Sequence, residues 1–183
     1  MVYNEEMQII FESHKTTDDN ENGIASGWND VEISQKGWEQ AQEMKDKYLD
    51  IKDVEAVFCS DLQRSYDTGL FVFREHKVPI IMDWRLRECN YGVLNGAAKD
   101  VVFEDRINKV TVPYQNGESY TDCINRMAEF LSELKESDQY KKIVIVGHRA
   151  TQYGIEHVLL GKDIETLVTE KWEWQPGWNY TLV

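Results

Sequence analysis

The sequence is poor in the residues that mark several classes of protein. Its 183 residues include only three prolines and three cysteines, and 20 lysines and arginines face 33 aspartates and glutamates. The resulting formal charge of −13 disfavours a nucleic-acid binder or a protein that docks on anionic membranes, because clustered Lys and Arg recognise both partners. The cysteines are odd in number and follow no recognisable spacing, so they indicate neither a disulfide framework nor a CxxC metal site. A reducing cytoplasm is therefore expected.

Long hydrophobic runs are also missing. The longest, around Val54–Phe58 and Ile143–Val146, fall far short of the roughly 20 residues that a membrane-spanning helix needs. The start, Met1–Glu6, is acidic where a secretion signal would be basic and then apolar. We therefore expect a cytoplasmic chain without membrane contact, and the length predicts one globular domain over residues 1–183.

Short β-rich runs alternate along the chain with longer helical patterns, which is typical of βαβ units. The alternation predicts a three-layer α/β/α fold with a mostly parallel sheet and helices on both faces. The predicted strands lie at Gln8–Phe11, Val54–Phe58, Pro79–Met82, Ile143–Val146, Glu170–Trp174 and Asn179–Val183. The predicted helices lie at Ser34–Leu49, Leu62–Phe73, Tyr120–Leu134 and Thr151–Leu160, the first capped by Ser34 and the last ended by Gly161.

Polar side chains follow three predicted strands at the sheet edge where ligands bind in α/β folds. The first strand runs into His14, the second into Ser60 and Arg64, and the fourth into His148 and Arg149. Loops at the carboxyl ends of parallel strands converge near helix N-termini, which favour anions. Taken singly, each side chain is better explained by packing, capping or solvation. Their joint placement predicts a phosphate site, a local positive well in a negative surface.

Several segments, in order, resemble the histidine phosphatase superfamily, the phosphoglycerate-mutase-like enzymes. Residues 11–20, FESHKTTDDN, are similar to Arg-His-Gly-x-[Ser/Thr]-x-x-Asn, and residues 26–37, SGWNDVEISQKG, are similar to Gly-Trp-x-Asp-x-x-Leu-[Ser/Thr]-x-x-Gly. Residues 60–68, SDLQRSYDT, resemble Ser-x-Leu-x-Arg-[Ala/Ser]-x-x-Thr, and Leu86–Glu88 resembles Leu-x-Glu. Gly117–Ser119 and Gly147–Arg149 complete a resemblance that spans residues 8–161.

The resemblance implies a phosphohistidine mechanism that needs no metal or cofactor. His14 would attack phosphorus, Arg64 and His148 would hold the phosphoryl oxygens, and Glu88 would act as general acid and base. Asn20, Ser26 and Gly27 match positions that touch phosphate or substrate in the family. The expected partner is a small phosphorylated substrate and not a nucleic acid; a homodimer is left open.

The chain departs from the family pattern beside the predicted nucleophile. Ser13 stands where the family has an arginine, and Lys15, itself a candidate phosphate ligand, stands where the family has a glycine. The first change removes a bidentate clamp that a lysine cannot copy geometrically. Two interpretations of Arg149 stay open: it supplies the missing guanidinium from the opposite loop, or it points into solvent and the site is impaired.

Three functions follow from these residues. A phosphomonoester hydrolase is favoured, because the stretch from Glu88 to Gly117 is short for the lid that family mutases close over their substrates. The alternatives are a phosphoglycerate-mutase-type phosphotransferase and a catalytically impaired protein that binds phosphorylated ligands.

Trp172 and Trp174 share one face of a predicted strand, which indicates core packing, a pocket wall or a dimer face.

Overall fold

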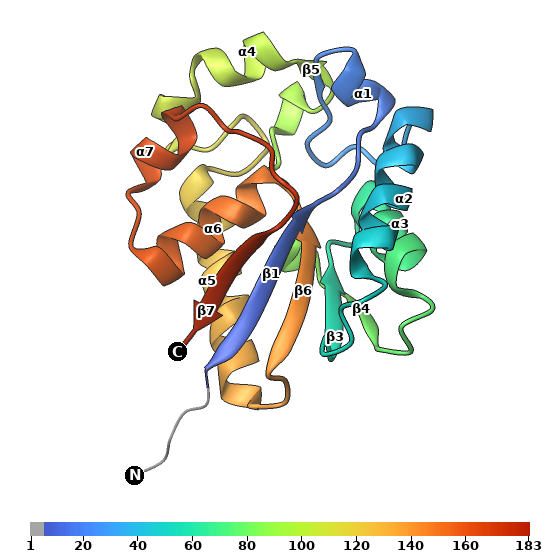
Figure 1. The fold of residues 1–183 in the computed structure, drawn as a ribbon. Helices are drawn as coiled ribbons and strands as arrows, with labels where there is room; N and C mark the ends of the chain where they lie inside the picture. The colour runs from blue at the N-terminus through green and yellow to red at the C-terminus, as the bar shows by residue number, and fades with distance from the viewer. Residues whose placement is uncertain (1–5) are drawn as a thin grey trace.

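The computed structural model describes residues 6–183 and contains a five-stranded sheet covered by helices on both faces (Figure 1). The strand order is β4-β3-β6-β1-β7; the first four strands are parallel, and β7 runs antiparallel to β1. The predicted three-layer α/β fold is therefore confirmed. The strands of this sheet are β1 (Met7–Ser13), β3 (Ala56–Cys59), β4 (Ile80–Met82), β6 (Lys142–Gly147) and β7 (Trp178–Leu182), while β2 (Ile24–Ala25) and β5 (Ala97–Ala98) pair in a separate two-stranded sheet. The α-helices are α1 (Asp18–Glu21), α2 (Gln35–Tyr48), α3 (Gln63–Phe73), α4 (Lys99–Glu104), α5 (Tyr120–Ser137), α6 (Arg149–Leu160) and α7 (Ile164–Thr169), with 3₁₀ turns η1 (Trp84–Leu86), η2 (Gly92–Leu94) and η3 (Arg106–Lys109).

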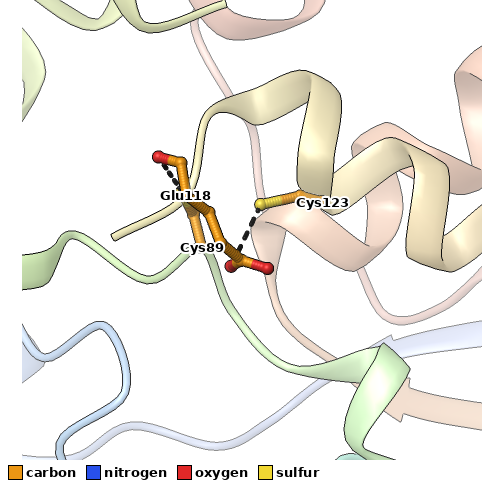
Figure 2. A group of neighbouring side chains, drawn as sticks. All are labelled: Cys89, Glu118 and Cys123. Carbon is orange, nitrogen blue, oxygen red and sulfur yellow. Dashed lines mark hydrogen bonds between the residues drawn. The ribbon is translucent and has the colours of Figure 1, made fainter. Parts of the chain in front are cut away.

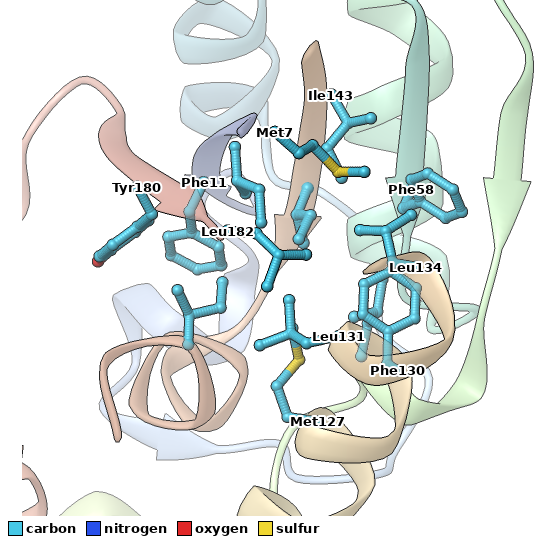
Figure 3. Close-up of a cluster of buried hydrophobic side chains, with 14 of the residues drawn as sticks. Met7, Phe11, Phe58, Met127, Phe130, Leu131, Leu134, Ile143, Tyr180 and Leu182 are labelled. Atoms are coloured by element: carbon cyan, nitrogen blue, oxygen red, sulfur yellow. The ribbon is translucent and has the colours of Figure 1, made fainter. Parts of the chain in front are cut away.

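Each face of the sheet packs against its own pair of helices. On one face, Phe11 of β1 and Phe58 of β3 share a buried cluster with Met127 of α5 (Figure 3). On the other face, Tyr48 of α2 and Phe73 of α3 pack ring to ring, with centroids 4.7 Å apart, over the sheet. Burial on both faces explains why the central strand β6 reads as an almost continuous apolar run.

A third buried cluster lies beyond the carboxyl ends of the parallel strands. It is formed by side chains from irregular segments, from short helices and from the first turns of α5 and α6, including Tyr91, Tyr114, Tyr120 and Val168. Figure 1 shows β5, α4 and α7 gathered at this end of the sheet. This cluster supports the loops that carry polar side chains toward the strand ends.

Most predicted elements match the observed ones within a few residues. The hydroxyl of Ser34 accepts the Gly37 N–H at 3.2 Å and so caps α2, and Gly161 ends α6 with a φ of +66°. The predicted strand Glu170–Trp174 is wrong. These residues form an irregular segment, because β7 already pairs with β1 at that edge and the indole N–H of Trp172 donates to Gln152 instead.

No helix within residues 6–183 combines the length and apolar character needed to cross a membrane. The acidic start that underlies the expectation of no secretion signal lies mostly in residues 1–5, outside the described residues. The cytoplasmic location stays a prediction.

Candidate active site

A cavity of about 640 Å³ lies at the carboxyl edge of the sheet, where the polar strand ends were predicted to meet. Seven of the nine candidate site residues line it. They are His14, Asn20, Ser26, Gly27, Arg64, Glu88 and Arg149. The other two, Lys15 and His148, lie beside it in different ways.

His14 directly follows β1 and is held by the backbone on both sides. The backbone N–H of His14 donates to the Gly147 carbonyl at 2.9 Å, and the ring Nδ1 lies 2.8 Å from the Lys15 carbonyl. Since a carbonyl only accepts, Nδ1 is assigned the proton and Nε2 keeps a free lone pair. Burial, reinforced by the charge of Arg64, lowers the pKa of His14 to about 3. The ring is therefore neutral and nucleophilic at neutral pH.

His148 packs against His14 with ring centroids 4.9 Å apart, and its side chain is fully buried. Its backbone N–H donates to the Thr151 hydroxyl at 3.0 Å, and that hydroxyl donates to the Leu86 carbonyl at 2.6 Å. Within residues 6–183, its Nε2 has no hydrogen-bond partner. Burial, followed by the charge of Arg64, lowers the pKa of His148 well below its usual value. A neutral buried ring next to the nucleophile is suited to hydrogen-bond a phosphoryl oxygen.

Arg64 lies in the first turn of α3, the helix that follows β3, and is 2% exposed. Its Nη1 donates to the Asn29 carbonyl at 3.0 Å and its Nη2 to the Gly27 carbonyl at 2.8 Å. A guanidinium has five N–H donors in a rigid fork, so these two anchors leave others for a ligand. Gly27 adopts a φ of +54°, and a Cβ there would meet Asn95 Oδ1 at 1.9 Å, so the anchor requires glycine.

Glu88 is held by two backbone N–H groups at its carboxylate and by two side-chain donors at its backbone carbonyl. Its Oε1 accepts the Cys89 N–H at 2.7 Å and the Ala150 N–H, in the first turn of α6, at 3.3 Å. Its backbone carbonyl accepts the Trp28 indole N–H at 2.7 Å and an N–H of Arg126 at 2.9 Å. Both carboxylate bonds end on Oε1, so Oε2 is the oxygen suited to exchange a proton with a bound ester.

Lys15 does not line the cavity. Its side chain is buried, and its ammonium lies 3.6 Å from the Glu12 carboxylate and 5.8 Å from the centre of the Trp174 ring. Burial lowers the pKa of Lys15, while Glu12 opposes that shift. The expected phosphate contact from Lys15 finds no support in this geometry.

Arg149 lines the cavity but is already engaged. Its Nη2 donates to the Glu170 carbonyl at 3.1 Å, and its guanidinium lies 5.4 Å from the centre of the Tyr153 ring. Among residues 6–183, its buried Nε has no hydrogen-bond partner. The guanidinium thus lies at the cavity wall rather than free in solvent.

The acidic residues near the nucleophile have structural roles. Asp19 accepts the hydroxyl of Ser26 at 2.7 Å, and Glu21 accepts the hydroxyl of Ser34 at 2.5 Å. Asn20 accepts the Thr17 N–H with its side chain and so caps α1. These bonds hold the loop from α1 to β2 around the cavity.

Two cysteines and a glutamate form the group that most resembles a metal site. The ligand atoms of Cys89, Glu118 and Cys123 lie within 4.8 Å of one another (Figure 2). The Glu118 carboxylate, however, already accepts Nε of Arg126 at 2.9 Å and Nη2 at 3.1 Å. Arg126 also donates to the carbonyls of residues 85, 87 and 88. Because a guanidinium balances this carboxylate, the group is better explained as a brace for Glu88 than as a cation site.

Sequence reasoning missed several cavity residues. Tyr91, Lys99 and Phe103 come from irregular segments or short helices that carried no recognisable pattern. The brace from Glu118 was also missed, although the Gly117–Ser119 match to the family was a signal for it. The pocket-wall interpretation of Trp172 and Trp174 agrees with the lining of the cavity.

Comparison with known proteins places the chain in a family. The model of the histidine phosphatase superfamily (branch 1) matches residues 9–174. "Putative phosphoserine phosphatase 2" of Hydrogenobacter thermophilus is 30% identical over 162 residues, which cover 84% of this chain and 79% of that protein. A 2,3-bisphosphoglycerate-dependent phosphoglycerate mutase of Staphylococcus aureus is 32% identical over 97 residues, 51% of this chain and 42% of the mutase.

A solved structure agrees at the level of the fold. The α-ribazole phosphatase from Shigella flexneri matches with a TM-score of 0.78 at 24% identity, over 88% of this chain and 83% of that one. The range that the family model matches includes His14, Arg64, Glu88 and His148. The structure brings all four to the cavity or its wall. The chain therefore belongs to the histidine phosphatase superfamily, branch 1, and its relatives support a phosphatase as its class of enzyme.

Proposed function

We propose that this protein hydrolyses small phosphomonoesters through a phosphohistidine intermediate on His14. The observation that carries the proposal is the tautomer and charge of His14. Its Nδ1 is tied to the Lys15 carbonyl, and its low pKa keeps the ring neutral in a cavity shared with Arg64 and Glu88. A neutral imidazole positioned next to cationic donors is what in-line attack on phosphorus requires.

In the first step, the Nε2 lone pair of His14 attacks phosphorus and the bond from phosphorus to the ester oxygen breaks. Glu88, entering as the carboxylic acid, gives its proton to the departing oxygen and becomes a carboxylate. Arg64 and His148 donate hydrogen bonds to the phosphoryl oxygens, where negative charge is spread in the transition state. The Lys15 carbonyl stabilises the Nδ1 proton of the phosphorylated ring.

In the second step, the Glu88 carboxylate takes a proton from a water molecule, whose oxygen attacks phosphorus. The bond from phosphorus to Nε2 breaks and its electron pair returns to His14. Inorganic phosphate leaves, and Glu88 is protonated again for the next cycle. Asn20, Ser26 and Gly27 border the bound ester, and Arg149 adds positive charge from the cavity wall.

Phosphate release from an aryl phosphate between pH 5 and 8 tests the proposal. We expect the wild type to release phosphate and to form an acid-labile, alkali-stable phosphoenzyme, and His14→Ala to do neither. Equal rates for the two proteins would contradict the mechanism. Release by neither protein, with retained binding of inorganic phosphate, would favour the impaired binding protein.

The phosphotransferase alternative is separated by its product. A mutase moves phosphate between two hydroxyls of one substrate, whereas the hydrolase releases it. The similarity to the Staphylococcus aureus mutase covers 42% of that enzyme, which favours hydrolysis. Transfer between the hydroxyls of phosphoglycerate that outpaces phosphate release would reverse this preference. The homodimer stays a prediction.

A further inference from the structure

Aromatic side chains wall the cavity beyond the polar groups around His14. Trp172, Trp174, Phe103 and Tyr91 all line it. Trp174 is 56% exposed, whereas Trp172 and Phe103 are half-buried. Exposed apolar surface that lies within a cavity beside convergent polar groups marks a ligand-binding surface.

Trp172 is held in a fixed orientation. Its indole N–H donates to Oε1 of Gln152 at 2.7 Å, and its ring packs against Trp178 with centroids 5.7 Å apart. Gln152 is itself buried on α6, and its Nε2 donates to the Tyr180 hydroxyl at 3.2 Å. The ring therefore needs little ordering when a ligand packs against it.

Trp174 lies beside a group of charges near the nucleophile, two of which, Lys15 and Glu12, are buried. The Lys15 ammonium lies 5.8 Å from its ring centre and 3.6 Å from Glu12, whose carboxylate is 1% exposed. Lys47 of α2 lies 2.7 Å from the same carboxylate and donates to the Pro176 carbonyl at 3.0 Å. These contacts join β1, α2 and the segment that carries Trp174.

Gly177 allows this segment to approach the charges. It adopts a φ of +83°, and a Cβ there would lie 2.8 Å from Nζ of Lys47 and 3.0 Å from Oε1 of Glu12. Lys15, one of the two residues that depart from the family pattern, thus has a position in the support of Trp174 rather than in the phosphate site.

Charges of both signs line the wall near the indoles. Glu43 lines the same cavity and repels a carboxylate. Lys99 donates to the Asn20 carbonyl at 3.3 Å and Arg149 to the Glu170 carbonyl at 3.1 Å, which holds both cations at the wall without cancelling their charge. An uncharged flat group gains from the rings without meeting this repulsion.

We propose that Trp172 and Trp174 form a subsite for a flat aromatic leaving group. The preferred substrates are then phosphomonoesters of aromatic alcohols or of hydroxyl-bearing heterocycles, with the phosphate on His14 and the ring against the two indoles. This inference rests on the proposed hydrolase. It adds the class of alcohol that the enzyme selects.

The test compares 2-naphthylmethyl phosphate with ethyl phosphate. Both release primary alcohols of similar intrinsic reactivity, so the ratio of their kcat/KM values reports recognition of the ring. We expect the wild type to favour the naphthyl ester by about tenfold, the scale of a well-packed aromatic contact. Trp174→Ala and Trp172→Ala should lose most of this ratio, and Trp174→Phe should keep part of it. The matched control is Trp84→Ala, a 51% exposed tryptophan outside the cavity, which should keep the full ratio.

Lys15 is tested as a positioning residue. Lys15→Met should raise KM for the naphthyl ester more than for ethyl phosphate, and Lys15→Arg should restore the difference because a guanidinium can also pair with Glu12. A change that affects both esters equally would assign Lys15 a purely structural role.

The outcomes separate the subsite from the proposed function. Equal kcat/KM for the two esters, with hydrolysis that depends on His14, overturns the subsite and leaves the hydrolase intact. If neither ester is hydrolysed, the hydrolase fails, and titration with 2-naphthylmethylphosphonate and ethylphosphonate tests the subsite alone. Tighter binding of the naphthyl compound that is lost in Trp174→Ala supports it, and equal affinities overturn it.

Discussion

The phosphate end and the aromatic wall of the cavity are built in different ways. His14, Arg64 and His148 come after β1, β3 and β6; the side chains of His14 and Arg64 bond backbone carbonyls, and the buried ring of His148 packs against His14. Trp172 and Trp174 lie on an irregular segment, and one of them is mostly exposed. The sheet edge therefore fixes the groups that react with phosphorus, while a loop presents the surface that selects the alcohol, a common division in α/β enzymes.

Removal of the nucleophile should have the largest effect. His14→Ala should reduce kcat for phosphate release by about 10³-fold or more, because no other side chain replaces the attacking nitrogen. Steady-state phosphate release measures the loss. The control is His157→Ala, a helical histidine whose ring contacts the Lys162 carbonyl outside the cavity. A similar loss in both variants would mean damage to the fold rather than to the chemistry.

Replacement of the buried guanidinium of Arg64 should have the second-largest effect on activity. Arg64→Lys should reduce kcat/KM by about 10²-fold, because the single nitrogen of a lysine does not span the Gly27 and Asn29 carbonyls and a phosphoryl group as the guanidinium fork does. Arg74→Lys, at the other end of α3 and 57% exposed, provides the matched control. Activity near wild type in Arg64→Lys would move the phosphate-binding role to another cation, with Arg149 the first to examine.

The effect on kcat of removing the Glu88 carboxyl group should depend on the leaving group. Glu88→Gln should reduce kcat for ethyl phosphate by about 10²-fold and should affect 4-nitrophenyl phosphate less, since nitrophenolate departs without a proton. Glu75→Gln, at an exposed carboxylate on the surface, should change neither rate. An equal loss for the two esters would contradict the role of Glu88 as the general acid.

The difference between the phosphate end and the aromatic wall also explains how much of the structure the sequence could predict. Apolar runs and helix caps located the strands and helices, and the motifs placed His14 and Arg64 at the sheet edge, because these features depend on neighbours in sequence. The direction of Lys15 depends on Glu12 and Lys47, which lies on another element, and was not predictable from spacing. The expected strand at Glu170–Trp174 failed for a related reason, since strand formation requires a partner edge and β7 occupies it.

Arg149 lies between the two sides of the cavity and should give a smaller effect. Arg149→Ala should raise KM severalfold with little change in kcat, because the guanidinium contributes charge from the wall while bonded to the Glu170 carbonyl. Kinetics with 4-nitrophenyl phosphate measure the effect. The control is Arg106→Ala, because Arg106 donates to the neighbouring carbonyl, that of Thr169, and does not line the cavity. If Arg149→Ala leaves phosphate release unchanged while Arg64→Ala abolishes it, the replacement of the missing family arginine by Arg149 is excluded.

The smallest expected effect concerns stability, and it again distinguishes the two ends. Burial lowers the pKa of His14 to about 3 from an ordinary value of 6.5, so the unfolded chain binds more protons than the folded one between these pH values. The free energy of unfolding should therefore fall as pH drops below about 6.5. His14→Gln should weaken this dependence by on the order of 1 kcal/mol between pH 7 and pH 5, measured by urea denaturation.

The substitution Trp174→Ala removes no titrating group and should keep the wild-type pH dependence of the free energy of unfolding. It is therefore the control from the other side of the cavity. An unchanged slope in His14→Gln would mean that His14 is protonated as readily in the folded protein as in the unfolded one. The neutral nucleophile would then have to be generated by the bound substrate rather than by the fold, and the phosphate end would no longer be the preorganised half of the cavity.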